Sequence, residues 1–415
     1  MPTNRRDFLR RGLGSSALIA STASVPLFLS RSAALLASED TAADRDRVLV
    51  VIELNGGNDG LNTVVPYADE DYRRARPTLA RSPDRVRKID ERIGLHSALG
   101  GFEKLLERGL LSVVQGVGYP NPNRSHFGSM SVWQSGRLNA KQDDIGWLAR
   151  VSDRSQAAVG ADPAALHIRE SASLPQALSG GDLAILSLTG PEQFRRRTAA
   201  AGTDDDPAQQ RRRDQLAPPV GEARGTLVDF VARTTATTDA AHARFSQLLD
   251  SSETSRQAGL RGRMSLIAQM IKAGLATRIY YTELAGFDTH ASQAGTHPGL
   301  LSELGDSVQA FISDLAAAGE AERVRVLVYS EFGRRLTENA SGGTDHGTVQ
   351  PVFLAGGALR HPFIGSPPDL RDLDPDGDPK HSIDFRRIYA TLLNDWLDCP
   401  SALVLGHNVE PLSLL

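Results

Sequence analysis

The stretch VLVVIELNGGNDGLN, residues 48–62, decides the fold of this 415-residue chain. Its first half is an apolar, largely β-branched run, the pattern typical of a strand in a parallel sheet. Its second half places three glycines among Asn and Asp residues, which predicts a sharp turn. In a parallel sheet such a turn lies at the carboxyl edge, where functional side chains gather. The loop is therefore either a plain tight turn or one wall of a cleft, in which Asn55 and Asp59 offer oxygen atoms.

From residue 47 onward, β-branched runs alternate with amphipathic helical patterns. This order is typical of an α/β fold with a mainly parallel, doubly wound sheet. Helical spacing of apolar residues predicts core-facing helices around 300–315 and 385–396. The strands that we expect are 48–54, 111–117, 165–168, 183–188, 278–284, 324–329 and 352–355.

A change of composition interrupts this alternation. Residues 193–224 are rich in Arg, Asp, Ala, Gln and Pro and almost lack large apolar side chains, so they cannot bury enough surface to be core. Helical patterns follow at 226–250 and 260–276. We predict one α/β domain over 45–415, in which 190–276 is a helical, partly charged insertion or cap.

Charge and cysteine content exclude two classes of function. The 46 Lys and Arg residues against 50 Asp and Glu residues give a net charge of -4, without the basic surplus that nucleic-acid binding requires. The single cysteine, Cys399, excludes an intramolecular disulfide and any CxxC site. A metal ion would therefore need ligands from His, Asp, Glu or Asn.

The first 37 residues have the features of an export signal. Arg5 and Arg6 precede Phe8 and Leu9, followed by an uncharged, moderately apolar segment, and the pair resembles a twin-arginine signal. Ser, Thr and Pro residues dilute that segment, which favours a cleaved signal over a membrane anchor. We therefore expect a periplasmic or cell-envelope protein that the twin-arginine translocase exports in folded form.

A polar cluster follows the second strand, at Tyr119–Phe127. Ser125 lies where a helix is expected to begin, so it is either a plain N-cap or a group placed to act on an anion. Arg124 beside it, and Arg334 in a later loop, could clamp an oxyanion or form ordinary ion pairs.

Three further clusters flank later strands of the expected sheet. Gly286-Phe-Asp-Thr-His290 follows one strand, Ser330-Glu-Phe-Gly-Arg334 follows the next, and Gly343-Thr-Asp-His-Gly347 precedes the last. Carboxylates and imidazoles together are the donors that zinc or a similar divalent ion prefers. The sequence predicts a shared metal site, with zinc, manganese or calcium as the candidates, from Asp288, His290, Glu331, Asp345 and His346.

Together with residues 54–62 and 118–127, these motifs resemble the twin-arginine-exported bacterial family known as domain of unknown function 1501, over roughly residues 47–412. That family is grouped with the alkaline phosphatase and sulfatase superfamily. The resemblance implies a doubly wound sheet, one or two metal ions, and hydrolysis of phosphate or sulfate esters. It also implies another exported envelope protein as a partner.

The superfamily pattern also implies roles for individual residues. Its first-strand metal ligand matches Asp59, its nucleophile matches Ser125, and its central Asp and His match Asp288 and His290. The pattern's Asp-His-Gly motif is matched in its residues by Asp345-His346-Gly347, but in its position after a strand by Glu331 and Phe332. We prefer the second match because it keeps the strand order, and His346 then matches the last metal histidine. Phe332 cannot bind a metal, so one site of a two-metal centre lacks a ligand unless His126 or Asp345 replaces it.

We therefore expect an exported metal-dependent hydrolase acting on a small or polymer-borne ester. Ser125 and His126 would be its catalytic groups, and Asn55, Arg124 and Arg334 would bind the substrate. The alternative is a non-catalytic exported binding or assembly protein that keeps the fold.

Overall fold

The computed structural model describes residues 47–141, 144–154, 163–168, 173–180, 185–188, 259–357 and 359–415. They belong to one compact unit, 46–415. The predicted signal, 1–37, and most of the predicted insertion lie outside the described residues. In the part of the chain that is described, no helix combines the length and the apolar character needed to span a bilayer.

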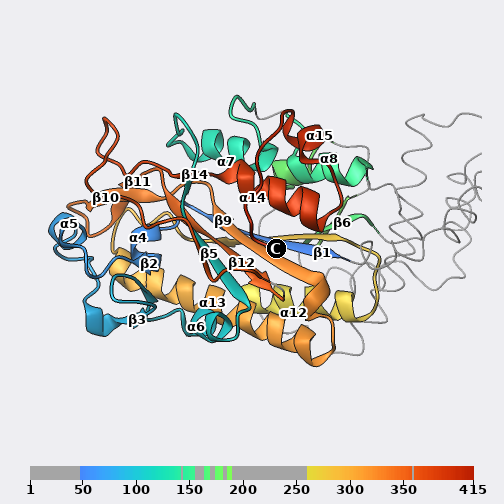
Figure 1. The fold of residues 1–415 in the computed structure, drawn as a ribbon, viewed down its shortest axis with the longest axis horizontal. Coiled ribbons are helices and arrows are strands. Elements are labelled where there is room, and N and C mark those ends of the chain that lie inside the picture. Colours follow the sequence, from blue (N-terminus) through green and yellow to red (C-terminus); the bar gives the residue numbers. More distant parts are fainter. Residues whose placement is uncertain are drawn as a thin grey trace, which may run out of the picture. The chain divides into compact units, whose positions relative to one another are not determined.

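A nine-stranded sheet forms the centre of this unit in the described residues (Figure 1). The order is β13-β5-β12-β9-β1-β8-β6-β7, and β14 also pairs with β5. Strand β12 runs antiparallel to β5 and β9, whereas the other pairings are parallel. The strands are β1 (Val48–Asn55), β5 (Leu111–Gly118), β6 (Ala165–Ile168), β7 (Ile185–Leu188), β8 (Ile279–Ala285), β9 (Val324–Ser330), β12 (Gln350–Gly356), β13 (Phe363–Ile364) and β14 (Ile383–Asp384). All seven expected strands are present, and the prediction of a mainly parallel α/β sheet is confirmed.

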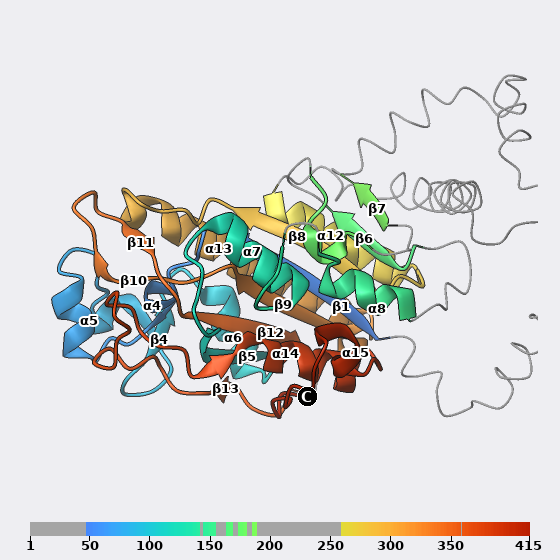
Figure 2. The same ribbon diagram turned by 90° about the horizontal axis from the view of Figure 1, so that it is seen from above.

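Helices cover both faces of the sheet (Figure 2). Along β1, Val50 and Ile52 pack into one hydrophobic core, whereas Leu49 and Val51 pack into the other, because alternate side chains of a strand point to opposite faces. The first core includes α6 (Gly100–Glu107), α12 (Gly259–Lys272) and α13 (Gln293–Ala317); the second includes α7 (His126–Ser135), α8 (Trp147–Arg154), α14 (Phe385–Thr391) and α15 (Ser401–Leu405). The sheet is therefore doubly wound, as predicted.

Helix α12 is the described part of the predicted insertion. Its Met264, Ile267 and Ile271 are buried in the same core as α13. This segment therefore belongs to the layer that covers the sheet. The helix expected at 226–250 lies outside the described residues.

Smaller elements lie beyond the ends of β1 and β9. Strand β1 leads into α4 (Gly60–Thr63), and β9 is followed by β10. The other small elements are helix α5 (Glu70–Ala75), a three-stranded sheet of β2 (Val64–Val65), β4 (Gly94–His96) and β3 (Val86–Lys88), and the strand pair β10 (Arg334–Glu338) and β11 (Thr344–His346). These elements hold the loops that carry most of the polar motifs of the sequence.

Candidate metal centre

Three neighbouring parallel strands bring the loops of the candidate site together. Strand β1 lies between β9 and β8, and Leu54 is level with both Ser330 and Leu284. The three strands therefore end at the same edge, and the loops that follow them meet there. The turn after β1 needs glycine: Gly56 has a φ of 120°, and a Cβ atom there would lie 2.2 Å from the backbone nitrogen of Asp288.

His126, Asp288 and His346 form the centre of the site. One possible ligand atom from each lies within 4.8 Å of the others. His346 Nε2 is 3.2 Å from Asp288 Oδ1, and His126 Nε2 is 3.6 Å from Asp288 Oδ2. His126 begins α7, Asp288 follows β8, and His346 ends β11, so the three side chains come from distant parts of the sequence.

His290 completes the cluster. Its Nε2 is 3.1 Å from Asp288 Oδ1 and 2.9 Å from His346 Nε2. The side chain of Asp288 is 50% exposed and that of His290 is 43% exposed. The cluster is therefore open to solvent on one side, as catalytic metal sites are.

The opposite nitrogen of each histidine has its own acceptor. His126 Nδ1 is 2.9 Å from Glu331 Oε1, His290 Nδ1 is 2.9 Å from Asp345 Oδ1, and His346 Nδ1 is 2.8 Å from the carbonyl oxygen of Arg124. Hydrogen bonding from His290 lowers the pKa of Asp345, so this carboxylate is ionised near neutral pH. Carboxylates and carbonyls only accept, so the tautomer with each proton on Nδ1 satisfies these three acceptors.

This assignment leaves a lone pair on each Nε2, and those of His290 and His346 face each other at 2.9 Å. Two lone pairs at that distance repel unless a cation lies between them, either a proton or a metal ion. Imidazole Nε2 atoms oriented by bonds at Nδ1, together with one carboxylate, are the donor set of zinc and related ions. The residues present therefore fit a divalent metal.

Glu331 lies directly behind His126. Only 1% of its side chain is exposed, and its carboxylate also accepts hydrogen bonds from the Gly56 backbone nitrogen at 2.8 Å and the Ser330 hydroxyl at 2.9 Å. The hydrogen bond from His126 to Glu331 raises the pKa of His126, and partial burial opposes that effect only in part. Glu331 thus orients His126 from behind the cluster.

Arg334 is buried, and its hydrogen bonds hold neighbouring loops together. Its guanidinium donates to the carbonyl oxygens of Gly57 (2.7 Å), Thr344 (2.6 Å), Phe287 (3.0 Å) and Gly56, and to Asp288 Oδ1 (2.7 Å). Partial burial by itself raises the pKa of Asp288, but the hydrogen bond and charge of Arg334 outweigh it and lower the pKa. All three guanidinium nitrogens are occupied, so Arg334 holds Asp288 in place and is not free to clamp a substrate.

Arg124 is occupied as well. Its guanidinium binds Asp374 Oδ2 and Asp376 Oδ2 at 2.8 Å, and Asp378 Oδ2 at 2.7 and 2.9 Å. These aspartates come from one loop, and Asp378 is fully buried. Of the two expected roles for Arg124, the structure shows the ion pair.

Asp59 is not part of the cluster. It is fully buried, 2.6 Å from Arg76 Nη1, and it also accepts hydrogen bonds from Gln293 Nε2 and the Asn62 backbone nitrogen. With these donors around it, its carboxylate is committed to the packing of α4 and α5. The structure therefore corrects the expectation that Asp59 lies among the ligands.

The remaining expected residues flank the cluster. Ser125 is the exposed N-cap of α7, and its side chain makes no capping hydrogen bond, so its hydroxyl is available. It lies between Arg124, whose carbonyl holds His346, and His126. Asn55 ends β1, and its Oδ1 is buried without a hydrogen-bond partner.

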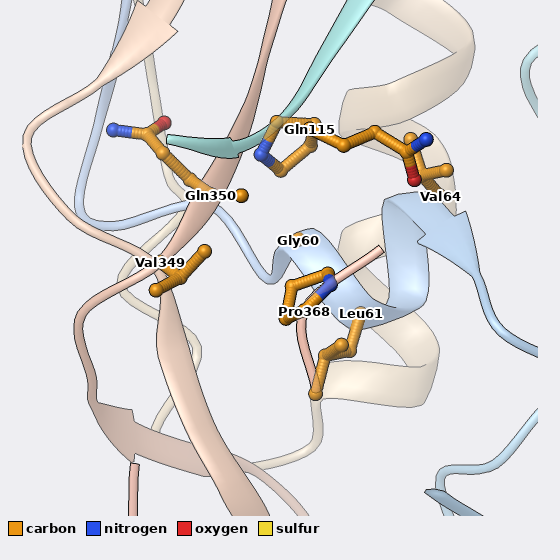
Figure 3. Close-up of a pocket in the computed structure, with 9 residues that line it drawn as sticks. Gly60, Leu61, Val64, Gln115, Val349, Gln350 and Pro368 are labelled. Carbon is orange, nitrogen blue, oxygen red and sulfur yellow. The ribbon is translucent and has the colours of Figure 1, made fainter. Parts of the chain in front are cut away.

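A small pocket also lies near the end of β1. Figure 3 shows it beside α4, lined by Gly60, Leu61, Val64, Gln115, Val349, Gln350 and Pro368. Its lining includes none of the four cluster residues, so we do not assign it to the metal centre.

The model of one family, described as protein of unknown function (DUF1501), matches residues 46–395. The chain belongs to this family. No curated protein matches the sequence. The match covers all four cluster residues, so the candidate metal centre of this DUF1501 chain lies within the part that defines its family.

Solved structures show a loose likeness to this DUF1501 chain. The PsFucS1 sulfatase from Pseudoalteromonas sp. is 12% identical, with 94% of this chain and 74% of that chain covered and a TM-score of 0.38. The C-terminal periplasmic domain of EcEptC from Escherichia coli is 9% identical, with 85% and 82% covered and a TM-score of 0.38. The alkaline phosphatase from the Antarctic bacterium TAB5 is 11% identical, with 74% and 91% covered and a TM-score of 0.31. These scores assign no residue of the DUF1501 chain a role.

Residues outside the predicted motifs also support the centre. Asn339 Nδ2 donates to Asp345 Oδ1 at 3.1 Å and to the carbonyl oxygen of His290 at 2.9 Å. The aspartates that hold Arg124 alternate along the sequence from 374 to 378, a spacing that could have marked the loop as a cation-binding element of the DUF1501 chain. Asn339 carries no comparable signal.

Proposed function

We propose that this chain is an exported, metal-dependent hydrolase of phosphate or sulfate esters. The observation that carries the proposal is the convergence of imidazole lone pairs and the Asp288 carboxylate at a solvent-exposed edge of a parallel sheet. The resemblance of its motifs to the alkaline phosphatase and sulfatase superfamily suggests the ester class.

His290, His346 and Asp288 would hold the metal, because their facing atoms lie 2.9–3.2 Å apart. Imidazole donors favour zinc over calcium, which prefers oxygen ligands. When bound, such an ion would polarise the ester and lower the pKa of a coordinated hydroxyl group.

His126 is the group best placed to handle a proton. Its Nε2 lies farther from Asp288 than those of His290 and His346, and Glu331 fixes its Nδ1. Held in this way, with its lone pair on Nε2, His126 would accept the proton of the attacking hydroxyl group and pass it to the leaving oxygen. Ser125 supplies either the nucleophile or the hydroxyl that orients water, and the first backbone N–H groups of α7 face the anion.

Elemental analysis of protein purified without added metal is the first test. The proposal predicts about one zinc or manganese ion per chain, and hydrolysis of p-nitrophenyl phosphate or sulfate esters that Ser125→Ala abolishes. His126→Ala should lower kcat and retain the metal, because His126 acts on the proton. His361→Ala, which removes an exposed histidine, is the matched control and should change neither.

The occupied arginines favour a second candidate, a non-catalytic exported protein that binds metal and assembles with another envelope protein. Arg124 and Arg334, the expected oxyanion clamps, both bind acidic side chains or carbonyls. One metal ion per chain without turnover of any ester tested would support this candidate over the hydrolase.

Export also belongs to the proposal, and it depends on the Arg5-Arg6 motif alone. Residues 1–37 fused to a reporter should send it to the periplasm through the twin-arginine translocase. Replacement of both arginines by lysine should keep the reporter inside, while the same replacement at Arg10 and Arg11 should not. A reporter that is exported without Arg5 and Arg6 would contradict the twin-arginine route.

A further inference from the structure

Four charged side chains lie around the candidate metal centre. Three carboxylates, those of Asp288, Glu331 and Asp345, lie in contact with the cluster histidines. One guanidinium, that of Arg334, lies among them. These groups have a formal charge of -2, which one divalent cation brings to zero.

Arg124 cannot add positive charge at the solvent-exposed side of the cluster. Asp374, Asp376 and Asp378 hold all three guanidinium nitrogens of Arg124, and Arg335 also bonds this acidic loop, through the carbonyl oxygen of Asp376. Among the loops around the cluster that the structure describes, Arg124 and Arg334 are therefore both committed. A substrate would meet one metal ion in surroundings that add no surplus positive charge.

A phosphate monoester carries a charge near -2 at pH 8, since its second pKa is about 6. A phosphodiester or a sulfate monoester carries a single negative charge. Each extra unit of charge near a carboxylate is repelled, and the repulsion is stronger where the local dielectric constant is below that of water. Surroundings without surplus positive charge therefore offer no second cation to balance the extra negative charge of a phosphate monoester.

We propose that the centre selects tetrahedral esters with a single negative charge, phosphodiesters or sulfate monoesters, over phosphate monoesters. This selection rests on the proposed function. Hydrolysis adds one water across the ester bond, giving an alcohol and an oxyacid, and needs no further reactant.

The test compares p-nitrophenyl phosphate with methyl p-nitrophenyl phosphate, which share a leaving group and differ by one charge. With full-length protein saturated with zinc at pH 8, kcat/KM should favour the diester by about tenfold or more, which corresponds to about 1.4 kcal/mol. The sulfate ester p-nitrophenyl sulfate forms a third arm, which distinguishes the two singly charged classes. A preference for p-nitrophenyl phosphate would overturn the inference and leave the hydrolase intact.

Binding tests the inference even without turnover. Calorimetry should show dimethyl phosphate, a single anion, binding to the zinc-loaded protein at least as tightly as inorganic phosphate, a double anion at pH 8. Tighter binding of inorganic phosphate would contradict the selection. Failure to hydrolyse any ester, with this order of binding kept, would overturn the proposed function alone.

Asp345→Asn gives the sharpest variant. It keeps an acceptor for His290 Nδ1 and removes one negative charge, so the monoester-to-diester ratio of kcat/KM should rise several-fold at saturating zinc. Asp314→Asn removes a carboxylate that pairs with Lys272 on α12, and it should leave the ratio unchanged. An unchanged ratio in Asp345→Asn would show that charge does not set the preference.

Discussion

Asp59 and Asp288 follow neighbouring strands and each binds an arginine, at 2.6 Å and 2.7 Å, yet their surroundings differ. Asp59 is fully buried, and donors from Arg76, Gln293 and a backbone amide surround its carboxylate. Asp288 is half exposed, and the Nε2 atoms of three histidines lie within 3.1–3.6 Å of it.

The difference lies in what the neighbours offer. A carboxylate surrounded by N–H donors is satisfied and holds the fold together. A carboxylate that faces imidazole nitrogens, as Asp288 does beside its bond to Arg334, can offer an oxygen to a metal ion. Sequence shows both as an aspartate in a polar loop, and only the neighbours separate a structural aspartate from a metal ligand.

Removal of the ligands should have the largest effect. Asp288→Ala combined with His346→Ala should reduce bound metal from about one ion per chain to none, because the imidazole and carboxylate donors are lost together. Elemental analysis of the purified protein measures this. A double variant that still binds one metal ion per chain would contradict the assignment of Asp288 and His346 as ligands.

Asp59→Ala should act on stability instead. It leaves the Arg76 guanidinium buried without its carboxylate, and breaking such a pair costs about 3–5 kcal/mol of unfolding free energy. Denaturant unfolding of chelator-treated protein measures the loss, and the folded fraction should still bind metal. A stable Asp59→Ala protein that has lost its metal would reverse the comparison.

Asp345→Ala tests the carboxylate that orients His290, a proposed metal ligand. Without its acceptor, His290 is no longer fixed in the tautomer that offers Nε2, and zinc affinity should fall about tenfold to a hundredfold. Competition with a chelator of known affinity gives the value. Asp314→Ala is the surface control, and an equal loss in both variants would argue against the orienting role.

Acidification should affect the cluster around Asp288 before it affects the buried surroundings of Asp59. This is the smallest of the expected effects. At the centre, partial burial lowers the pKa of His346, and protons compete with a metal ion for the imidazole nitrogens, so metal should be released as the solution becomes acidic. Burial by itself raises the pKa of Asp59, but the charge and hydrogen bond of Arg76 outweigh it and the pKa is lowered.

The stability from Asp59 is therefore present above its unfolded pKa of about 3.9 and is lost only as pH falls through the lower folded value. Metal content and circular dichroism measured from pH 8 to pH 3 should show release well before unfolding. Coincident transitions would mean that the regions are not independent.

The sequence predicts the sheet well, because its strands are continuous β-branched runs whose burial depends on local pattern. It also predicts Asp288, His290 and His346, because strand ends at one edge of a parallel sheet place their loops together. The short strands β13 and β14, two residues each, carry no such pattern and were not predicted.

The roles of Arg334 and Arg124 depend on contacts between distant segments of the chain, which the local spacing of residues does not indicate. Arg334 differs from a substrate-binding arginine only through the carbonyl oxygens that surround it, which come from three separate loops. Arg124 is held by aspartates about 250 positions later. Both roles depend on the completed fold.

The pairing of β1 with β8 and β9 also has a consequence for the order of folding. Residues near position 50 must find partners near positions 280 and 325, so closing these contacts is costly in chain entropy and is expected to be slow. The proposed metal ligands, Asp288, His290 and His346, come from segments up to 58 residues apart and meet only when these strands are paired. No short segment could hold such an ion alone, so a metal that binds there would bind late and stabilise the finished protein without nucleating it.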